Sequence, residues 1–289
     1  MIVGLMTNAA QQIDLIGHSG KALSNRALDE LKRSFEAVGY VVVRNVISRP
    51  KLAELHANIL STFENKKRTG ELMAGGGLFS GHLNCFPGEG SRFIYDELRD
   101  AGLLDFIKTI FSKPTGNPFV GCNLNLPNSV VQHYHVDSNF LQEFMIANVA
   151  VVDTEIANGA IELVPGTHRQ FYKFWRFAVE RQQRNGVRIP MKQGDVLIRS
   201  SNLWHRGMPN RTSVPRPMVA LRFVERGNVA VADPFHEGDG SIAFHENWFR
   251  PTLLGRLRER TFITAPISYD AYRFVRSLIG NKGYDDAQA

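Results

Sequence analysis

The 289-residue chain is poor in cysteine and in long apolar runs, and each shortage excludes a class of protein. Its two cysteines, Cys85 and Cys122, are too few for a disulfide framework and form no Cys-x-x-Cys pair of the kind that holds zinc or does redox chemistry. No run of 18 apolar residues is present, so the sequence predicts no transmembrane helix. We therefore expect a protein of a reducing compartment, cytoplasmic and without membrane contact.

Clustered charge is also missing. The chain carries 34 Lys and Arg against 28 Asp and Glu, but no basic run alternates with aromatic residues, which disfavours nucleic-acid binding. The apolar start at Met1–Met6 has no basic residue before Lys21, so we expect no secretory signal. The small positive excess favours a small-molecule partner that is anionic or polar, and the chain is expected to be a monomer or a homodimer.

Apolar residues at helical spacing predict three helices in the first 115 residues. Ser24 and Gly39 are placed to begin and end the first, and Ser48 with Pro50 to begin the second. A strand is predicted between these two helices at Tyr40–Val43. The segments that carry the three helical patterns are Leu28–Val38, Leu52–Phe63 and Arg92–Phe111.

A glycine-rich stretch, Ala74–Gly88, separates the last two helices. It lacks the Gly-Lys-Ser/Thr ending of a phosphate-binding loop, so we predict a mobile loop that closes over a substrate. His82 within it is a candidate substrate contact.

From about Pro118 the chain changes to short β-rich runs broken by Gly, Pro and Asn, which is typical of a sandwich or barrel. We predict one α+β domain over residues 1–289, with a jelly-roll core at about 118–226. Helices at about 24–115 act as buttress and lid, and a helical extension follows at about 227–289. The predicted strands are Phe119–Leu126, Val130–Val136, Met145–Val152, Ala160–Val164, Asp195–Arg199 and Met218–Glu225.

Metal-ligand residue types meet on one of these strands. Side chains two positions apart project from the same face of a strand, which puts His133, His135 and Asp137 together. With His205, a His-x-Asp pair makes the two-histidine, one-carboxylate face that binds non-haem Fe(II) and leaves positions open. His133 is the rival ligand. Arg216, at the start of a later strand, is suited to grip a carboxylate through two hydrogen bonds.

These residues resemble the phytanoyl-CoA dioxygenase family of Fe(II)- and 2-oxoglutarate-dependent oxygenases. The resemblance runs from about Phe35 to Glu225 and rests on Gln132-x-x-His135-x-Asp137, on Asn158–His168, and on Gly194-Asp195 with the later histidine and arginine. It implies a double-stranded β-helix, a cupin-like jelly roll. It also implies His135, Asp137 and His205 as iron ligands, and Arg216 on the C5 carboxylate of 2-oxoglutarate.

Further cosubstrate contacts are less specified. Asn123 and Asn125 precede the ligand strand, and Gln132 opens the ligand motif. Relatives often carry Ser or Thr two residues after the distal histidine, where this chain has Gly207. Water, or a hydroxyl from Thr167 or Ser213, is the expected substitute.

The implied activity is hydroxylation or another oxidation of a small metabolite of secondary metabolism, using Fe(II), 2-oxoglutarate and O2 and releasing succinate and CO2. Candidate substrate contacts, besides His82, are His133, Trp204 and Arg206. The rim of the substrate site is expected from the segments Gly75–Gly88, Ser138–Phe144, Phe171–Gly186 and Asp233–Trp248.

Two alternatives stay open. One is a metal-dependent isomerase or hydrolase of the cupin type, using zinc or manganese, which has no need of a carboxylate clamp such as Arg216. The other is a jelly-roll protein that binds 2-oxoglutarate without catalysis.

Overall fold

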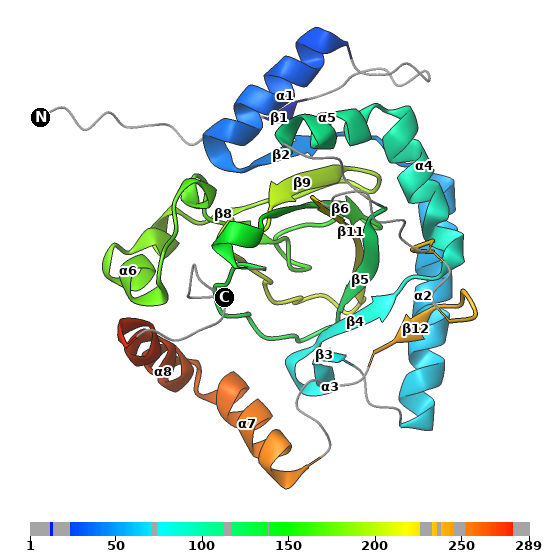
Figure 1. Ribbon diagram of the computed structural model, residues 1–289. Coiled ribbons are helices and arrows are strands. Elements are labelled where there is room, and N and C mark those ends of the chain that lie inside the picture. Colours follow the sequence, from blue (N-terminus) through cyan, green and yellow to red (C-terminus); the bar gives the residue numbers. More distant parts are fainter. Residues whose placement is uncertain are drawn as a thin grey trace, which may run out of the picture.

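Two β-sheets form the centre of the protein in the computed structural model, which describes residues 12–13, 24–70, 74–111, 117–137, 139–225, 233–235, 238–245 and 252–279 (Figure 1). The larger sheet has the order β1-β2-β9-β6-β11-β5-β4-β12, with β3 beside β4, and the smaller has the order β10-β7-β8. The strands are β1 (Gln12–Ile13), β2 (Tyr40–Val43), β3 (Ala74–Gly76), β4 (His82–Phe86), β5 (Phe119–Asn125), β6 (Phe144–Ala150), β7 (Glu162–Leu163), β8 (Val187–Arg188), β9 (Val196–Ser200), β10 (His205–Arg206), β11 (Arg216–Val224) and β12 (Ala243–Phe244).

Helices lie around the sheets, most of them beside the larger one (Figure 1). Within the described ranges, none is long and apolar enough to cross a bilayer. The helices are α1 (Asn25–Val38), α2 (Arg49–Thr69), α3 (Gly77–Ser80), α4 (Arg92–Asp100), α5 (Leu103–Ile110), α6 (Phe174–Val179), α7 (Leu253–Thr264) and α8 (Pro266–Leu278).

Helix α1 begins and ends where its capping residues predict, and α2 begins after Ser48 as predicted but continues to Thr69, beyond the predicted apolar stripe. The Ser24 hydroxyl accepts a hydrogen bond from the Ala27 amide, and Gly39 ends α1 in the left-handed conformation. The predicted third helix is wrong in one respect, because it divides into α4 and α5 at Gly102. That glycine has a φ of 75°, which a continuous α-helix does not accommodate.

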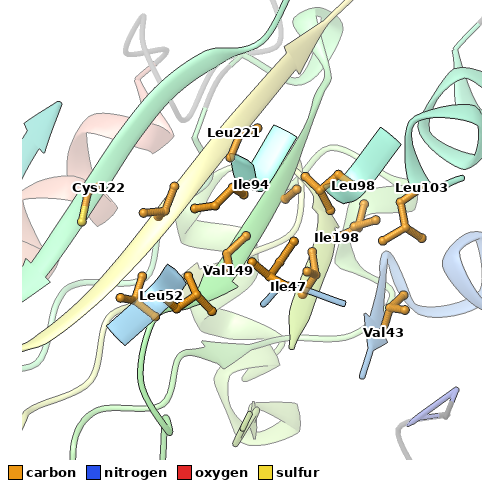
Figure 2. Close-up of a cluster of buried hydrophobic side chains, with 14 of the residues drawn as sticks. Val43, Ile47, Leu52, Ile94, Leu98, Leu103, Cys122, Val149, Ile198 and Leu221 are labelled. Carbon is orange, nitrogen blue, oxygen red and sulfur yellow. The ribbon is translucent and has the colours of Figure 1, made fainter. Parts of the chain in front are cut away.

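One face of the larger sheet packs against these helices and forms the main core. Figure 2 shows Val149, Ile198 and Leu221 from three neighbouring strands meeting Leu52 of α2 and Ile94 of α4. All five side chains are completely buried. Side chains alternate along a strand, so the residues directly before and after each of these three strand positions face the opposite way, toward the smaller sheet.

That opposite face is polar at one end. In the register of β4, β5 and β11, Asn125 lies directly between His82 and Arg216. Register partners share a face of the sheet, so these three side chains project together. All three are buried, at 4% exposure or less.

The glycine-rich stretch differs from its prediction as a mobile loop. Residues His82–Phe86 form β4, which pairs with β5, and Leu83 and Cys85 are buried in the core. The alternation of polar and apolar residues in this segment is a strand signal that its glycines obscured. Parts of other predictions lie outside the described residues. These are the Met1–Met6 segment, then Ser138, residues 236–237 and residues 246–248 of the expected rim, and residues 227–232, 249–251 and 280–289 of the expected helical extension.

Two helix-ending glycines provide a test of this packing. Gly39 and Gly70 both have positive φ, but a Cβ on Gly39 would lie 2.5 Å from His168 Nδ1, whereas a Cβ on Gly70 would meet nothing within 4 Å. Gly70→Ala should cost about 1 kcal/mol of unfolding free energy, the price of the left-handed conformation alone. Gly39→Ala should cost at least about 1 kcal/mol more, measured by urea denaturation. Equal losses would contradict the close approach of His168.

Candidate metal centre

The ligand segment around His135 lies antiparallel to the segment around His205. The His135 amide donates to the His205 carbonyl at 2.9 Å, and the His205 amide donates back at 3.0 Å. The Gln132 amide donates to the Gly207 carbonyl at 2.9 Å. The three steps from Gln132 to His135 therefore lie opposite only two steps, from His205 to Gly207, so the first segment contains a bulge. The prediction of an uninterrupted strand at Val130–Val136 is wrong for this reason.

Three potential ligand atoms converge at this contact. Asp137 Oδ1 lies 3.8 Å from His135 Nε2 and 3.5 Å from His205 Nε2. One atom from each of the three residues falls within 4.8 Å of the other two. An ion bound at about 2.1 Å from nitrogen and oxygen ligands fits between atoms at this separation.

The backbone fixes which ring nitrogen faces the ion. His135 Nδ1 is 2.8 Å from the His133 carbonyl oxygen, and His205 Nδ1 is 2.9 Å from the Leu203 carbonyl oxygen. Since a carbonyl only accepts, each Nδ1 carries the proton and donates it. Nε2 is thereby the ring nitrogen through which each histidine can bind a metal.

Burial and neighbouring charges set the protonation of the ligands. Burial, assisted by His205, lowers the pKa of His135 to about 3, so this imidazole is neutral at physiological pH. Burial alone would raise the pKa of Asp137, but Arg199 and then His205 outweigh it and hold this pKa well below the ordinary range. His135 and Asp137 therefore need no proton removed before they bind a cation.

Arg199 is the residue that sequence reasoning missed. Its Nη1 lies 2.7 Å from Asp137 Oδ2, and its Nε donates to Asn148 Oδ1 at 3.1 Å. The Arg199 side chain is 6% exposed. The signal that could have indicated it was a single charged residue within the otherwise apolar strand β9. No motif stands beside it in the sequence.

Arg216 is a buried cation with a different environment. Its Nη2 donates to the Gly159 carbonyl at 3.0 Å, and within the described part of the chain no carboxylate lies within 4.0 Å of its guanidinium. Burial lowers its pKa to about 10, which still leaves it charged at neutral pH. Beside it in the register, Asn125 has a buried Oδ1 without a hydrogen-bond partner. A buried cation without a counter-charge is costly, so an anionic ligand bound beside Arg216 would be stabilised.

The packing around Gly207 explains why it lacks a side chain. Its amide donates to Gln132 Oε1 at 2.8 Å, and a Cβ on Gly207 would lie 2.6 Å from the same oxygen and 3.1 Å from His82 Cε1. The His82 ring, whose Nε2 donates to the Val130 carbonyl, therefore lies next to the position where relatives carry a hydroxyl. Burial, with a contribution from nearby Arg216, lowers the pKa of His82 to about 4.

The expected hydroxyl substitutes have other surroundings. The Thr167 hydroxyl donates to the Val164 carbonyl at 2.7 Å and accepts from the Trp204 amide at 3.0 Å, so both of its bonds hold the turn before His205. Ser213 is exposed. Asn123, on the inward face of β5, donates to Asn84 Oδ1 at 3.3 Å. The roles predicted for these residues toward the cosubstrate stay predictions.

Three predicted substrate contacts lie against protein groups. The His133 ring is beside α8, with its Nδ1 2.9 Å from Asp270 Oδ1, and is not grouped with the three ligand atoms as its strand position predicted. Trp204 is 2% exposed and stacks on Phe177 with ring centroids 4.2 Å apart. Arg206 is paired with Glu162 at 2.7 Å. Their roles as substrate contacts stay predictions.

Comparisons with known proteins identify the family and the fold. A model of the phytanoyl-CoA dioxygenase family matches residues 35–218. The epimerase SnoN, solved with Fe3+, alpha ketoglutarate and nogalamycin RO, has a TM-score of 0.58 at 19% identity over 74% of this chain and 95% of SnoN. The carbocyclase SnoK of nogalamycin biosynthesis has a TM-score of 0.52 at 17% identity over 70% of this chain and 84% of its own. AviO1 from Streptomyces viridochromogenes Tue57 has a TM-score of 0.51 at 19% identity over 74% of this chain and all of AviO1. The predicted double-stranded β-helix is confirmed.

Protonation of the buried histidines predicts how the metal-free protein responds to acid. His82 and His135 have folded pKa values of about 4 and about 3 against an ordinary 6.5. Below pH 6.5 the unfolded chain binds protons that the folded chain does not, so stability falls as the pH decreases toward 4, by at most about 1.4 kcal/mol per pH unit for each histidine. Denaturation in the presence of a chelator at pH 7.5, 6.0 and 5.0 measures this. His82→Gln should show a shallower slope, and an unchanged slope would contradict the neutral, buried state of His82.

A double-mutant cycle tests the contact at Gly207. Gly207→Ala should displace the side-chain amide of Gln132. The hydrogen bond from the Gly207 backbone amide to Gln132 Oε1 is then lost, at a cost of about 1 kcal/mol of stability. In Gln132→Ala protein the obstructing oxygen is gone, so the same Gly207→Ala change should cost less by about that amount. Additive losses in thermal or urea denaturation would show that the two residues are not in contact.

Proposed function

Because the chain belongs to the phytanoyl-CoA dioxygenase family, we propose that it is a non-haem Fe(II)- and 2-oxoglutarate-dependent dioxygenase that oxidises a small molecule. The observation that carries this proposal is a pair of complementary features on the inner side of the fold. One is the three-ligand face of His135, Asp137 and His205. The other is the buried, carboxylate-free guanidinium of Arg216.

The donor set fits iron. Two imidazoles and one carboxylate suit Fe(II), and three protein ligands leave further coordination positions open. Both ring orientations are already held by backbone carbonyls, at His133 for one ring and Leu203 for the other. Bound iron supplies the oxidative chemistry with 2-oxoglutarate and O2, releasing succinate and CO2.

Arg216 is proposed to receive the carboxylate of 2-oxoglutarate that lies far from the metal. A planar guanidinium pairs with a carboxylate through two parallel hydrogen bonds, which also fixes the orientation of the cosubstrate. The His82 ring and the unpartnered Asn125 Oδ1 flank this position. Gly207 leaves the space that the imidazole of His82 occupies, in place of a hydroxyl side chain.

The inward face of the larger sheet favours a polar substrate. Asn84, Asn123 and Asn148 project from it in the register of β4, β5 and β6. We propose hydroxylation of a polar or anionic small metabolite, with the same site able to direct another oxidative outcome. SnoN and SnoK, described as an epimerase and a carbocyclase, show that similar folds accommodate such outcomes.

Two alternatives predict different behaviour. A zinc- or manganese-dependent isomerase or hydrolase of the cupin type has no use for the buried Arg216 cation, which is the observation against it. A non-catalytic 2-oxoglutarate-binding protein would bind the cosubstrate without consuming it. Succinate formation under air, with or without a substrate, separates this alternative from the enzyme.

Titration of the anaerobic protein with Fe(II) and then 2-oxoglutarate tests the proposal. We expect the weak visible charge-transfer band of an iron-bound 2-oxo acid, and its absence from iron-loaded protein would contradict cosubstrate binding. Asp137→Ala should abolish the band and succinate production, because it removes one of three ligands. Full succinate production by this variant would refute the metal assignment.

Arg216→Met should act on the cosubstrate alone. Loss of a charge-assisted, two-bond contact predicts a 2-oxoglutarate dissociation constant at least about tenfold higher, equivalent to about 1.4 kcal/mol. Affinity for the metal should be unchanged. Arg169→Met, which removes an exposed arginine bonded to the Glu36 carbonyl, is the matched control and should leave both constants unchanged. Equal effects of the two variants would contradict the clamp.

A further inference from the structure

The carboxylate of Asp137 has two oxygens in different surroundings. Oδ1 faces the two histidine Nε2 atoms, at 3.8 and 3.5 Å. Oδ2 is turned to Arg199, 2.7 Å from its Nη1. The two atoms are close without the alignment of a hydrogen bond, and neither has another polar partner within the described residues. The contact is thus an ion pair that occupies Oδ2 and leaves Oδ1 on the side of the two histidines.

Arg199 is itself held in place from the other side. It projects inward from β9, and its Nε donates to Asn148 Oδ1 on the neighbouring strand β6. Its side chain is almost completely buried, so the ion pair is weakly screened by solvent. The guanidinium is therefore fixed relative to the sheet, and it fixes the carboxylate in turn.

A carboxylate with two free oxygens can bind one ion through both. In a six-coordinate site with two histidines, a carboxylate that uses one oxygen leaves three positions, and one that uses both leaves two. A chelating 2-oxo acid takes two positions and O2 takes one more. The site of the proposed function thus has enough positions only if Asp137 binds through a single oxygen.

We infer that Arg199 is a positioning residue that holds Asp137 as a one-oxygen ligand by occupying Oδ2. This inference rests on the proposed function. It predicts a divergence that a purely structural ion pair would not produce. Without Arg199, binding of the bare metal is retained or tighter, because a second oxygen and one fewer positive charge face the ion, whereas binding of 2-oxoglutarate is weaker.

The experiment compares Arg199→Met with unaltered protein in two titrations. Co(II), followed by its visible absorption, measures affinity for the bare metal. Anaerobic titration of the Fe(II)-loaded protein with 2-oxoglutarate, followed by the charge-transfer band, measures affinity for the cosubstrate. We expect a Co(II) dissociation constant no more than about twofold higher than that of unaltered protein, and a 2-oxoglutarate constant at least about tenfold higher, equivalent to about 1.4 kcal/mol.

Arg44→Met is the matched control. Arg44 pairs through Nη1 with the buried carboxylate of Asp195 at 2.5 Å, so its loss also leaves a carboxylate without this partner, but at the other end of β9 from the metal centre. It should lower stability and leave both titrations unchanged. Arg199→Lys keeps the charge without the second donor to Asn148, and should weaken 2-oxoglutarate binding at least about threefold. If Arg199→Met does not fold, Arg199→Lys decides.

The possible outcomes are distinct. A 2-oxoglutarate constant unchanged in Arg199→Met, or in Arg199→Lys where only that variant folds, overturns the inference and leaves the proposed function standing. Parallel loss of Co(II) and 2-oxoglutarate binding overturns it as well, since that is the behaviour of a structural ion pair. Failure of the unaltered protein to bind 2-oxoglutarate with iron present overturns the proposed function, and the inference with it.

Discussion

The reciprocal backbone hydrogen bonds between His135 and His205 are the contact on which the rest of the site depends. They join two segments far apart in the sequence and place both imidazoles on the same side. Each ring then bonds to the carbonyl two residues before it, at His133 and Leu203. The position of both rings, and the nitrogen that each turns away from the backbone, are therefore consequences of backbone geometry. A metal ion at this site would meet rings that the folding of the sheets has already oriented.

Two buried arginines give the interior its electrostatic character, and they differ in one respect. Arg199 has its counter-charge in Asp137, whereas Arg216 has, among the described residues, only carbonyl oxygens within hydrogen-bonding distance. Burying a cation without an anion opposes folding. The fold accepts this cost at Arg216 because the core on the far side of the same strands, around Val219 and Leu221, is closely packed. A dianionic cosubstrate would supply the missing charge.

Sequence alone predicted the features that are local. Helices α1 and α2 were found from their caps and apolar stripes, and the convergence of His135, Asp137 and His205 from a spacing typical of a known family. Features set by pairing between distant strands were missed. The bulge before His135 depends on the count of residues opposite it, and the inward place of Arg199 depends on the register of β9 with β6. Glycines in the segment that contains His82 concealed a strand that only its pairing with β5 reveals.

The position of Asn125 between His82 and Arg216 has a consequence for how this protein tolerates change in length. Leu124, the next residue back along β5, is completely buried on the opposite face. Deletion or insertion of a single residue within β5 would bring an asparagine into the core and an apolar side chain beside the guanidinium. Core packing and the polar site thus depend on the same register of β5. We therefore expect this strand to tolerate substitutions but no change in length, and the connections between strands to tolerate both.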